Sequence, residues 1–213
     1  MKLYCISGLG ADKRVFDLLK VNHKLIHLDW ITPLKNENCI DYSTRLASSI
    51  DTTKPFGLIG VSFGGMIAVE IAKQLNSDIT ILISSTETKH GLRSIYRSLG
   101  KTKIINLMPE FCFKIPKPIA YYLFSAKNKS LLADILNDSD LKLTKWSVKQ
   151  IINWTNTTKI KNCYKIGGNH DRMIPQNTDS NTKIINDTGH FMIVDKADEV
   201  SQIINSILEN DKV

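Results

Sequence analysis

The sequence predicts an α/β fold: a three-layer α/β/α sandwich around a mostly parallel sheet of about six strands. Two observations lead to this prediction. Short, continuous apolar runs alternate along the chain with segments whose apolar residues recur at helical spacing. Strands that are apolar throughout are typical of a parallel sheet with helices on both faces, because both sides of each strand are then buried.

The individual elements follow from this alternation. The apolar runs expected as strands are 3–6, 25–30, 56–61, 79–83, 163–166 and 182–185. The segments expected as helices are 12–20, 41–50, 64–75 and 198–209. Asp41 is expected to cap the second of these helices, because a short polar side chain before an apolar-periodic segment is typical of an N-cap.

The alternation stops after Ser85 and resumes at Cys163. Residues 86–154 contain helical patterns, several prolines and an aromatic stretch, but no clear strand. We therefore expect a helical insertion over one end of the sheet, within a single domain that spans residues 1–213.

Composition narrows the class of protein. The chain is 42% hydrophobic and 23% charged, and no run approaches the ~18 apolar residues that a membrane-spanning helix needs. The first residues are too short an apolar run for a signal peptide, so a cytoplasmic protein is expected. The net charge of +7 comes without a dense basic run, which indicates a solvated basic surface and no nucleic-acid partner. The four scattered cysteines indicate reduced core thiols and no metal site.

One motif carries chemistry. Gly60-Val61-Ser62-Phe63-Gly64 matches G-x-S-x-G and lies between an expected strand and an expected helix. A sharp strand-to-helix turn of this kind brings the two glycine positions into crowded contacts and leaves the serine hydroxyl projecting from the sheet. Ser62 is therefore the candidate nucleophile.

The stretch from Gly60 to Met66 resembles the nucleophile elbow of the α/β-hydrolase superfamily, close to its small carboxylesterase-like members. The likeness covers nearly the whole chain, because the order of elements matches too, and it is weakest across residues 86–154. The family's N-terminal antiparallel hairpin is expected to be absent. The family's strand order then implies that the second strand lies at one edge of the sheet, beside the first, and that 182–185 forms the other edge.

The resemblance implies an oxyanion hole made by the backbone N–H groups of Leu9 and Phe63. The family often has His-Gly where this chain has Ser7-Gly8, a departure that concerns loop anchoring rather than the main-chain donor. The same loop has a competing interpretation. A Gly-x-Gly pair after a strand, followed by Asp29, imitates a dinucleotide-binding fingerprint, although Lys13 occupies the position of its third glycine.

The triad acid should follow the penultimate strand, where residues 167–175 resemble the family's loop and place Asp171 as its carboxylate. Glu87, just past the fourth strand, is the alternative, since some family members carry the acid there. The base should follow the last strand, where Gly189-His190-Phe191 resembles the family's histidine turn. The chain order Ser, Asp, His is the one that this fold uses.

The remaining histidines are assigned structural or surface roles, with His170 at the edge of the site; they are His23, His27, His90 and His170. The resemblance implies a serine hydrolase that cleaves a carboxylic ester or thioester through an acyl-enzyme, with no metal and no cofactor. Its partner would be a small-molecule substrate, and the segment 86–154 would be a lid. Apolar residues that could line the pocket include Leu107, Met108, Phe111, Phe113, Tyr121, Tyr122 and Phe124.

Two alternatives stay open at this point. The same triad serves related chemistry, such as hydrolysis of a carbon–carbon bond or a lyase reaction. A ligand-binding protein that has kept the fold without catalysis is the other, because function depends on the site rather than on the fold.

Overall fold

The computed structural model describes residues 1–102, 104–176 and 179–210. Its centre is a six-stranded sheet in the order β2-β1-β3-β4-β5-β6, and every pair of neighbouring strands is parallel. The strands are β1 Lys2–Ile6, β2 Lys24–His27, β3 Phe56–Val61, β4 Ile79–Ile83, β5 Cys163–Gly168 and β6 Thr182–Ile185. The predicted fold class is confirmed, and so is the placement of β2 and β6 at the two edges.

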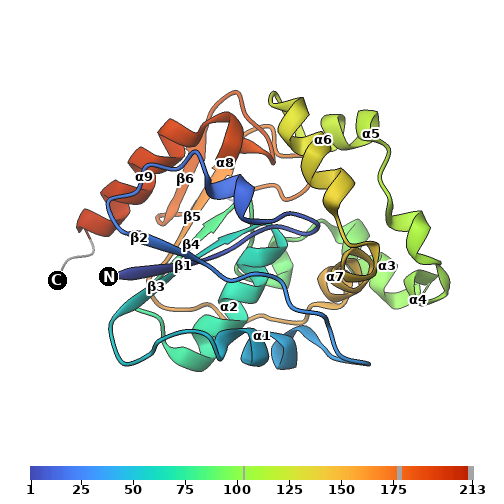
Figure 1. Cartoon of the computed structure of the whole chain (residues 1–213), viewed down its shortest axis with the longest axis horizontal. Helices are drawn as coiled ribbons and strands as arrows, with labels where there is room; N and C mark the ends of the chain where they lie inside the picture. The colour runs from blue at the N-terminus through green and yellow to red at the C-terminus, as the bar shows by residue number, and fades with distance from the viewer. Residues whose placement is uncertain (103, 177–178, 211–213) are drawn as a thin grey trace.

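Helices cover both faces of the sheet (Figure 1). One face carries α1 (Cys39–Ala47) and α2 (Phe63–Leu75). The other carries a short 3-10 helix, η1 (Lys13–Phe16), together with α8 (Met192–Asp195) and α9 (Ala197–Asn210). The sheet is therefore the middle of three layers.

The alternation of side chains along each strand divides the core in two. In β3, Ile59 and Val61 pack toward the α9 face, whereas Leu58 packs toward α1 and α2. The central strand β4 is buried at every residue. Ten consecutive residues of α2 are buried as well, from Phe63 to Ala72, so this helix is held rigidly beneath the end of β3.

The segment between β4 and β5 is helical, as predicted. It contains η2 (Lys89–Gly91), α3 (Ser94–Thr102), α4 (Ile104–Leu107), η3 (Glu110–Phe113), α5 (Lys117–Phe124), α6 (Lys129–Asp138) and α7 (Leu141–Asn153). These helices gather at the right of Figure 1, the side toward which the strands run. None of the described helices is long and apolar enough to cross a membrane.

Three local predictions need correction. The expected helix at 12–20 is only the single turn η1, and Leu18 is 47% exposed rather than packed on the core. Helix α1 begins earlier than expected, because the side chain of Asn38 caps it by accepting hydrogen bonds from the N–H groups of Ile40 and Asp41. Cys112 is exposed, whereas the other three cysteines are buried as predicted.

Candidate active site

Ser62 occupies a sharp turn between β3 and α2. Its backbone has φ +52° and ψ −120°, a conformation that costs free energy for any residue other than glycine. The turn is possible because of the glycines beside it. A Cβ at Gly60 would collide with the backbone of Gly65, and one at Gly64 would collide with the carbonyl oxygens of Ile6 and Ser7.

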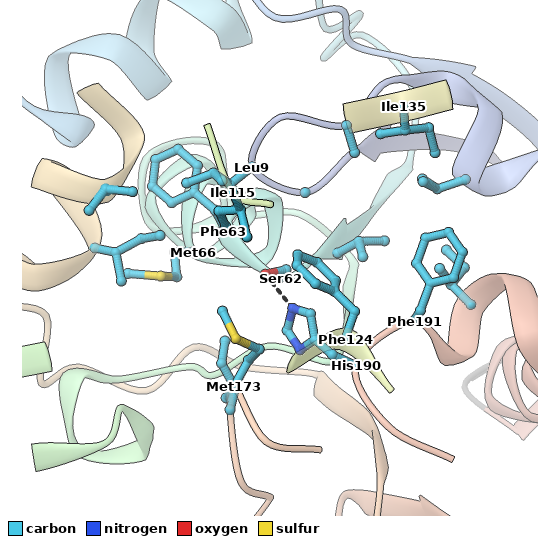
Figure 2. A pocket seen from close by; sticks show the side chains of 18 of the residues that line it. Leu9, Ser62, Phe63, Met66, Ile115, Phe124, Ile135, Met173, His190 and Phe191 are labelled. Atoms are coloured by element: carbon cyan, nitrogen blue, oxygen red, sulfur yellow. Dashed lines mark hydrogen bonds between the residues drawn. The ribbon is translucent and has the colours of Figure 1, made fainter. Parts of the chain in front are cut away.

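The turn aims the Ser62 hydroxyl at His190, as the dashed line in Figure 2 shows. The distance from Ser62 Oγ to His190 Nε2 is 2.8 Å. On the other side of the ring, Nδ1 lies 2.9 Å from Asp171 Oδ2 and 3.1 Å from Oδ1. An imidazole protonated at Nδ1 satisfies both contacts, since it donates to the carboxylate and leaves Nε2 free to accept the serine proton.

Asp171 is held in one orientation. Its Oδ1 atom accepts hydrogen bonds from the N–H groups of Met173 and Ile174 at 2.8 and 2.9 Å. The side chains of Asp171 and His190 are both almost completely buried. The alternative acid lies elsewhere: Glu87 accepts a hydrogen bond from the N–H of Ile160 at 2.6 Å. The structure thus brings together Ser62, His190 and Asp171, and it leaves Glu87 outside this chain of contacts.

The loop after β1 lies beside Ser62. Ser7 Oγ donates to the carbonyl oxygen of Ala11 at 2.8 Å, and Trp30 Nε1 donates to the same oxygen at 3.1 Å. These bonds close the loop around Leu9. Ser7 therefore anchors this turn, at the position where the family that the sequence resembles often has a histidine.

The two candidate oxyanion donors face the same cavity as Ser62, because Leu9 and Phe63 both line it. As the first residue of α2, Phe63 has an N–H group with no acceptor inside the helix. The Phe63 ring stacks on Trp30 at a centroid distance of 5.6 Å and meets Trp146 edge-on at 5.9 Å. This packing holds the first turn of α2 in place.

A cavity of about 180 Å³ opens at the Ser62 hydroxyl. Figure 2 shows apolar side chains on every side of the serine, including Leu9 and Ile115, Phe124 and Phe191, and Met173. The segment between β4 and β5 supplies ten of the lining residues: Leu92, Tyr96, Ile115, Phe124, Leu132, Ile135, Leu136, Val148, Ile151 and Ile152. The space beside the nucleophile is therefore suited to an apolar group.

Most of the apolar residues expected to line the pocket do not reach the cavity at Ser62. Of that set, Phe124 lines the cavity, whereas Leu107, Phe111 and Tyr122 are 86%, 71% and 63% exposed. Six aliphatic residues of α6 and α7 line the cavity instead: Leu132, Ile135, Leu136, Val148, Ile151 and Ile152. Tyr96 supplies a polar group at the wall, and burial raises the pKa of its phenol, so it keeps its proton at neutral pH.

The end of α5 is attached to both triad loops. The Phe124 ring meets His190 edge-on at 5.4 Å, and the carbonyl oxygen of Phe124 accepts from the N–H of Phe191. Arg172 donates to Ser125 Oγ and to the carbonyl oxygen of Tyr122, both at 2.7 Å, and its guanidinium lies over the Tyr122 ring. The sequence gives no indication of the contacts of Ser125 and Arg172, because no local pattern joins positions so far apart.

Comparison by sequence finds no relative: no protein-family model matches the chain, and no curated protein matches it. Comparison by structure finds solved proteins of similar fold. An enol-lactonase from Burkholderia xenovorans superposes with a TM-score of 0.76 at 13% identity, covering 98% of this chain and 91% of that one. A thermophilic esterase from Thermogutta terrifontis gives 0.74 at 13% identity, covering 100% and 91%. MenH from S. aureus gives 0.70 at 18% identity, covering 100% and 95%.

These likenesses extend over nearly the whole of both chains. The chain has the α/β-hydrolase fold. Within the described residues, no group of three or more His, Cys, Asp or Glu side chains is placed to hold a metal ion.

Proposed function

We propose that this protein is a serine hydrolase that cleaves carboxylic esters or thioesters, with Ser62 as nucleophile, His190 as base and Asp171 as orienting acid. One observation carries the proposal. The three side chains form an unbroken hydrogen-bonded chain of 2.8 and 2.9 Å that ends at a serine in a strained turn, at the mouth of an apolar cavity. The solved structures with this fold include proteins described as an esterase and an enol-lactonase, which supports the same class of reaction.

The geometry supports a two-step acyl transfer. His190 Nε2 takes the proton of Ser62 Oγ as that oxygen attacks the substrate carbonyl. The resulting imidazolium is stabilised by the buried Asp171 carboxylate and then gives its proton to the leaving alcohol or thiol. Water, activated by the same imidazole, releases the acyl group and regenerates Ser62.

The negative charge that develops on the carbonyl oxygen would be stabilised by the N–H groups of Leu9 and Phe63. Fixed donors of this kind contribute on the order of 3 kcal/mol each to the transition state. Both are held by contacts that need no rearrangement during the reaction: the closed loop around Leu9 and the aromatic packing around Phe63.

The helical segment 86–154 would act as the lid that shapes the substrate site. Its residues make much of the cavity wall, and α5 is attached beside His190. Because an apolar cavity of about 150 Å³ can hold a benzene ring, a cavity of about 180 Å³ suits a slightly larger aryl or alkyl group.

The proposal is tested with a fluorophosphonate probe and with p-nitrophenyl butyrate as substrate, on the wild type and on Ser62→Ala. Wild-type protein is expected to be labelled covalently and to turn over the ester, and the variant is expected to do neither. Ser130→Ala is a matched control, because Ser130 lies exposed on α6 and its hydroxyl bonds only to Asn128 within the described residues. It should behave as the wild type does.

Other outcomes distinguish the alternatives. Labelling of Ser62 without turnover of any ester or thioester would favour the related chemistries that use the same triad. A wild type that neither labels nor turns over a substrate would refute the proposal and favour a binding protein with this fold.

A further inference from the structure

A second, smaller cavity adjoins the one at Ser62. It has a volume of about 50 Å³ and shares four lining residues with the main cavity: Leu9, Ile115, Phe124 and Leu136. Three of the shared residues, Leu9, Ile115 and Phe124, lie around Ser62 in Figure 2. The two cavities therefore adjoin, with these four side chains between them; the one at Ser62 is called the inner cavity below and the smaller one the outer cavity.

The outer cavity differs from the inner one in charge. Lys114 and Lys117 line it, together with Asn137, and no aspartate or glutamate does. Neither lysine takes part in an ion pair or a side-chain hydrogen bond within the described residues, and both are exposed. These two lysines and Asn137 thus carry donor groups that no acceptor among the described residues engages, beside the apolar cavity at Ser62.

Glu110, four residues before Lys114, makes no ion pair with either lysine within the described residues, and the two acidic residues beside Asn137 are already engaged. Asp138 pairs with Arg14 at 2.8 Å. Asp140 caps α7, where its carboxylate accepts from the N–H groups of Lys142 and Leu143. The hydroxyl of Ser139, which also lines the cavity, donates to the carbonyl oxygen of Gly10. The protein therefore neutralises neither lysine with these neighbouring groups.

The distribution of charge along the chain points the same way. Lys and Arg occur throughout, but acidic residues are sparse between positions 86 and 154, where twelve Lys and Arg face five Asp and Glu. This segment has a net charge of +7, equal to that of the entire chain, so the remainder is balanced. The excess positive charge of the chain therefore lies in the segment that supplies ten residues lining the cavity at Ser62, and such an excess favours the approach of anions.

We infer that the substrate of the proposed hydrolase carries an anionic group, remote from the scissile carbonyl, that binds at Lys114 and Lys117 in the outer cavity. The inference rests on the proposed function and adds a substrate class to it: an ester or thioester with an apolar part beside Ser62 and a carboxylate or phosphate beyond it. Both anions match the same pair of ammonium groups.

The test compares anionic with neutral substrates of similar apolar content. One pair is the p-nitrophenyl monoester of adipic acid, which bears a free carboxylate, and p-nitrophenyl butyrate. The other pair is hexanoyl-coenzyme A, which bears phosphates, and the neutral hexanoyl thioester of N-acetylcysteamine. The measured quantity is the ratio of kcat/KM for the anionic member to that for the neutral member. The pair with the higher ratio identifies carboxylate or phosphate as the recognised group.

The variant is Lys114→Gln combined with Lys117→Gln. The control is Lys127→Gln combined with Lys142→Gln, which removes the same charge from exposed lysines of the same segment that do not line the outer cavity. Wild type should favour the anionic member of at least one pair. Because an exposed ionic contact changes an equilibrium by up to about fivefold, the ratio should fall by roughly fivefold or more in the first variant. The ratio should be unchanged in the control variant.

Two outcomes in the variants would overturn the inference. If the ratio of kcat/KM values fell equally in both double variants, the preference would come from general attraction by the positive segment. If the ratio fell in neither variant, Lys114 and Lys117 would not bind the anionic group. A wild type without charge preference that still depends on Ser62 for turnover would overturn it while leaving the proposed function intact. A wild type that turns over none of the four substrates and resists fluorophosphonate would overturn both.

Discussion

Asp171→Asn changes one atom of the candidate site and should remove nearly all activity. The Oδ1 atom of Asp171 accepts from two main-chain N–H groups, those of Met173 and Ile174. An asparagine side chain must turn its only oxygen toward these donors, since its NH₂ group cannot accept. The NH₂ group then takes the place of Oδ2, 2.9 Å from His190 Nδ1.

This exchange reverses the tautomer of the imidazole. Nδ1 must become the acceptor of a bond from the asparagine, so the ring proton moves to Nε2. A protonated Nε2 cannot take the proton of Ser62 Oγ, which lies 2.8 Å away. The corresponding change in a serine protease lowers kcat by about 10⁴-fold, equal to about 5.5 kcal/mol at 1.36 kcal/mol per tenfold. We expect a loss of that order here.

The assay is steady-state hydrolysis of p-nitrophenyl butyrate, with thermal unfolding followed by circular dichroism to show that the variant is folded. Glu87→Gln is the control, because Glu87 bonds to the Ile160 N–H and not to His190. It should stay within an order of magnitude of wild type. If Asp171→Asn kept more than a tenth of the activity, or if Glu87→Gln lost as much, the assignment of the acid would be wrong.

Two further predictions concern stability and thiol reactivity. Hydrogen bonds from Arg45 hold the pKa of the Glu37 carboxyl below its ordinary value of 4.5. Near neutral pH, the free energy of unfolding of the wild type should therefore exceed that of Glu37→Gln by about 1 kcal/mol. This difference should disappear as the pH falls from 4.5 through the lowered pKa of Glu37, because the carboxylate is then protonated. Thermal melting of both proteins at neutral and acidic pH checks this, and a gap independent of pH would contradict it. Burial raises the pKa of Cys5 and of Cys39 to about 12, so Cys112 alone should react rapidly with Ellman's reagent in the native protein. All four thiols should react after unfolding, and a second fast thiol in the native state would refute the described packing.

The sheet was predictable because its strands are short apolar runs between polar or glycine-rich residues. The expected spans of β3, β4 and β6 match the observed ones, and the order of the edge strands follows from the resemblance. The same kind of pattern led to a wrong prediction at 12–20. Val15 and Phe16 are buried as an apolar face requires, but the helical turn ends at Phe16 and Leu18 is exposed.

The residues of the candidate triad were predictable for a related reason. Ser62, Asp171 and His190 each follow a parallel strand, and the carboxyl ends of such strands meet at one edge of the sheet. Spacing along the chain therefore indicates which side chains come together. Their hydrogen bonds, and the contrast between Asp171 and Glu87, depend on loop conformations that this pattern does not describe.

The sequence by itself determined the three layers, the parallel sheet and the turns that carry Ser62, Asp171 and His190, because these depend on local periodicity and on glycines at positions where a Cβ would clash. Only the tertiary structure decided the shape of the cavity at Ser62 and which charged residues lie beside it. Its walls come from helices far apart in the chain, and helical periodicity says which face is apolar but not what that face covers. The exposure of Phe111, the place of partly buried Phe124 at the cavity and the exposed lysines beside the outer cavity follow from non-local packing alone.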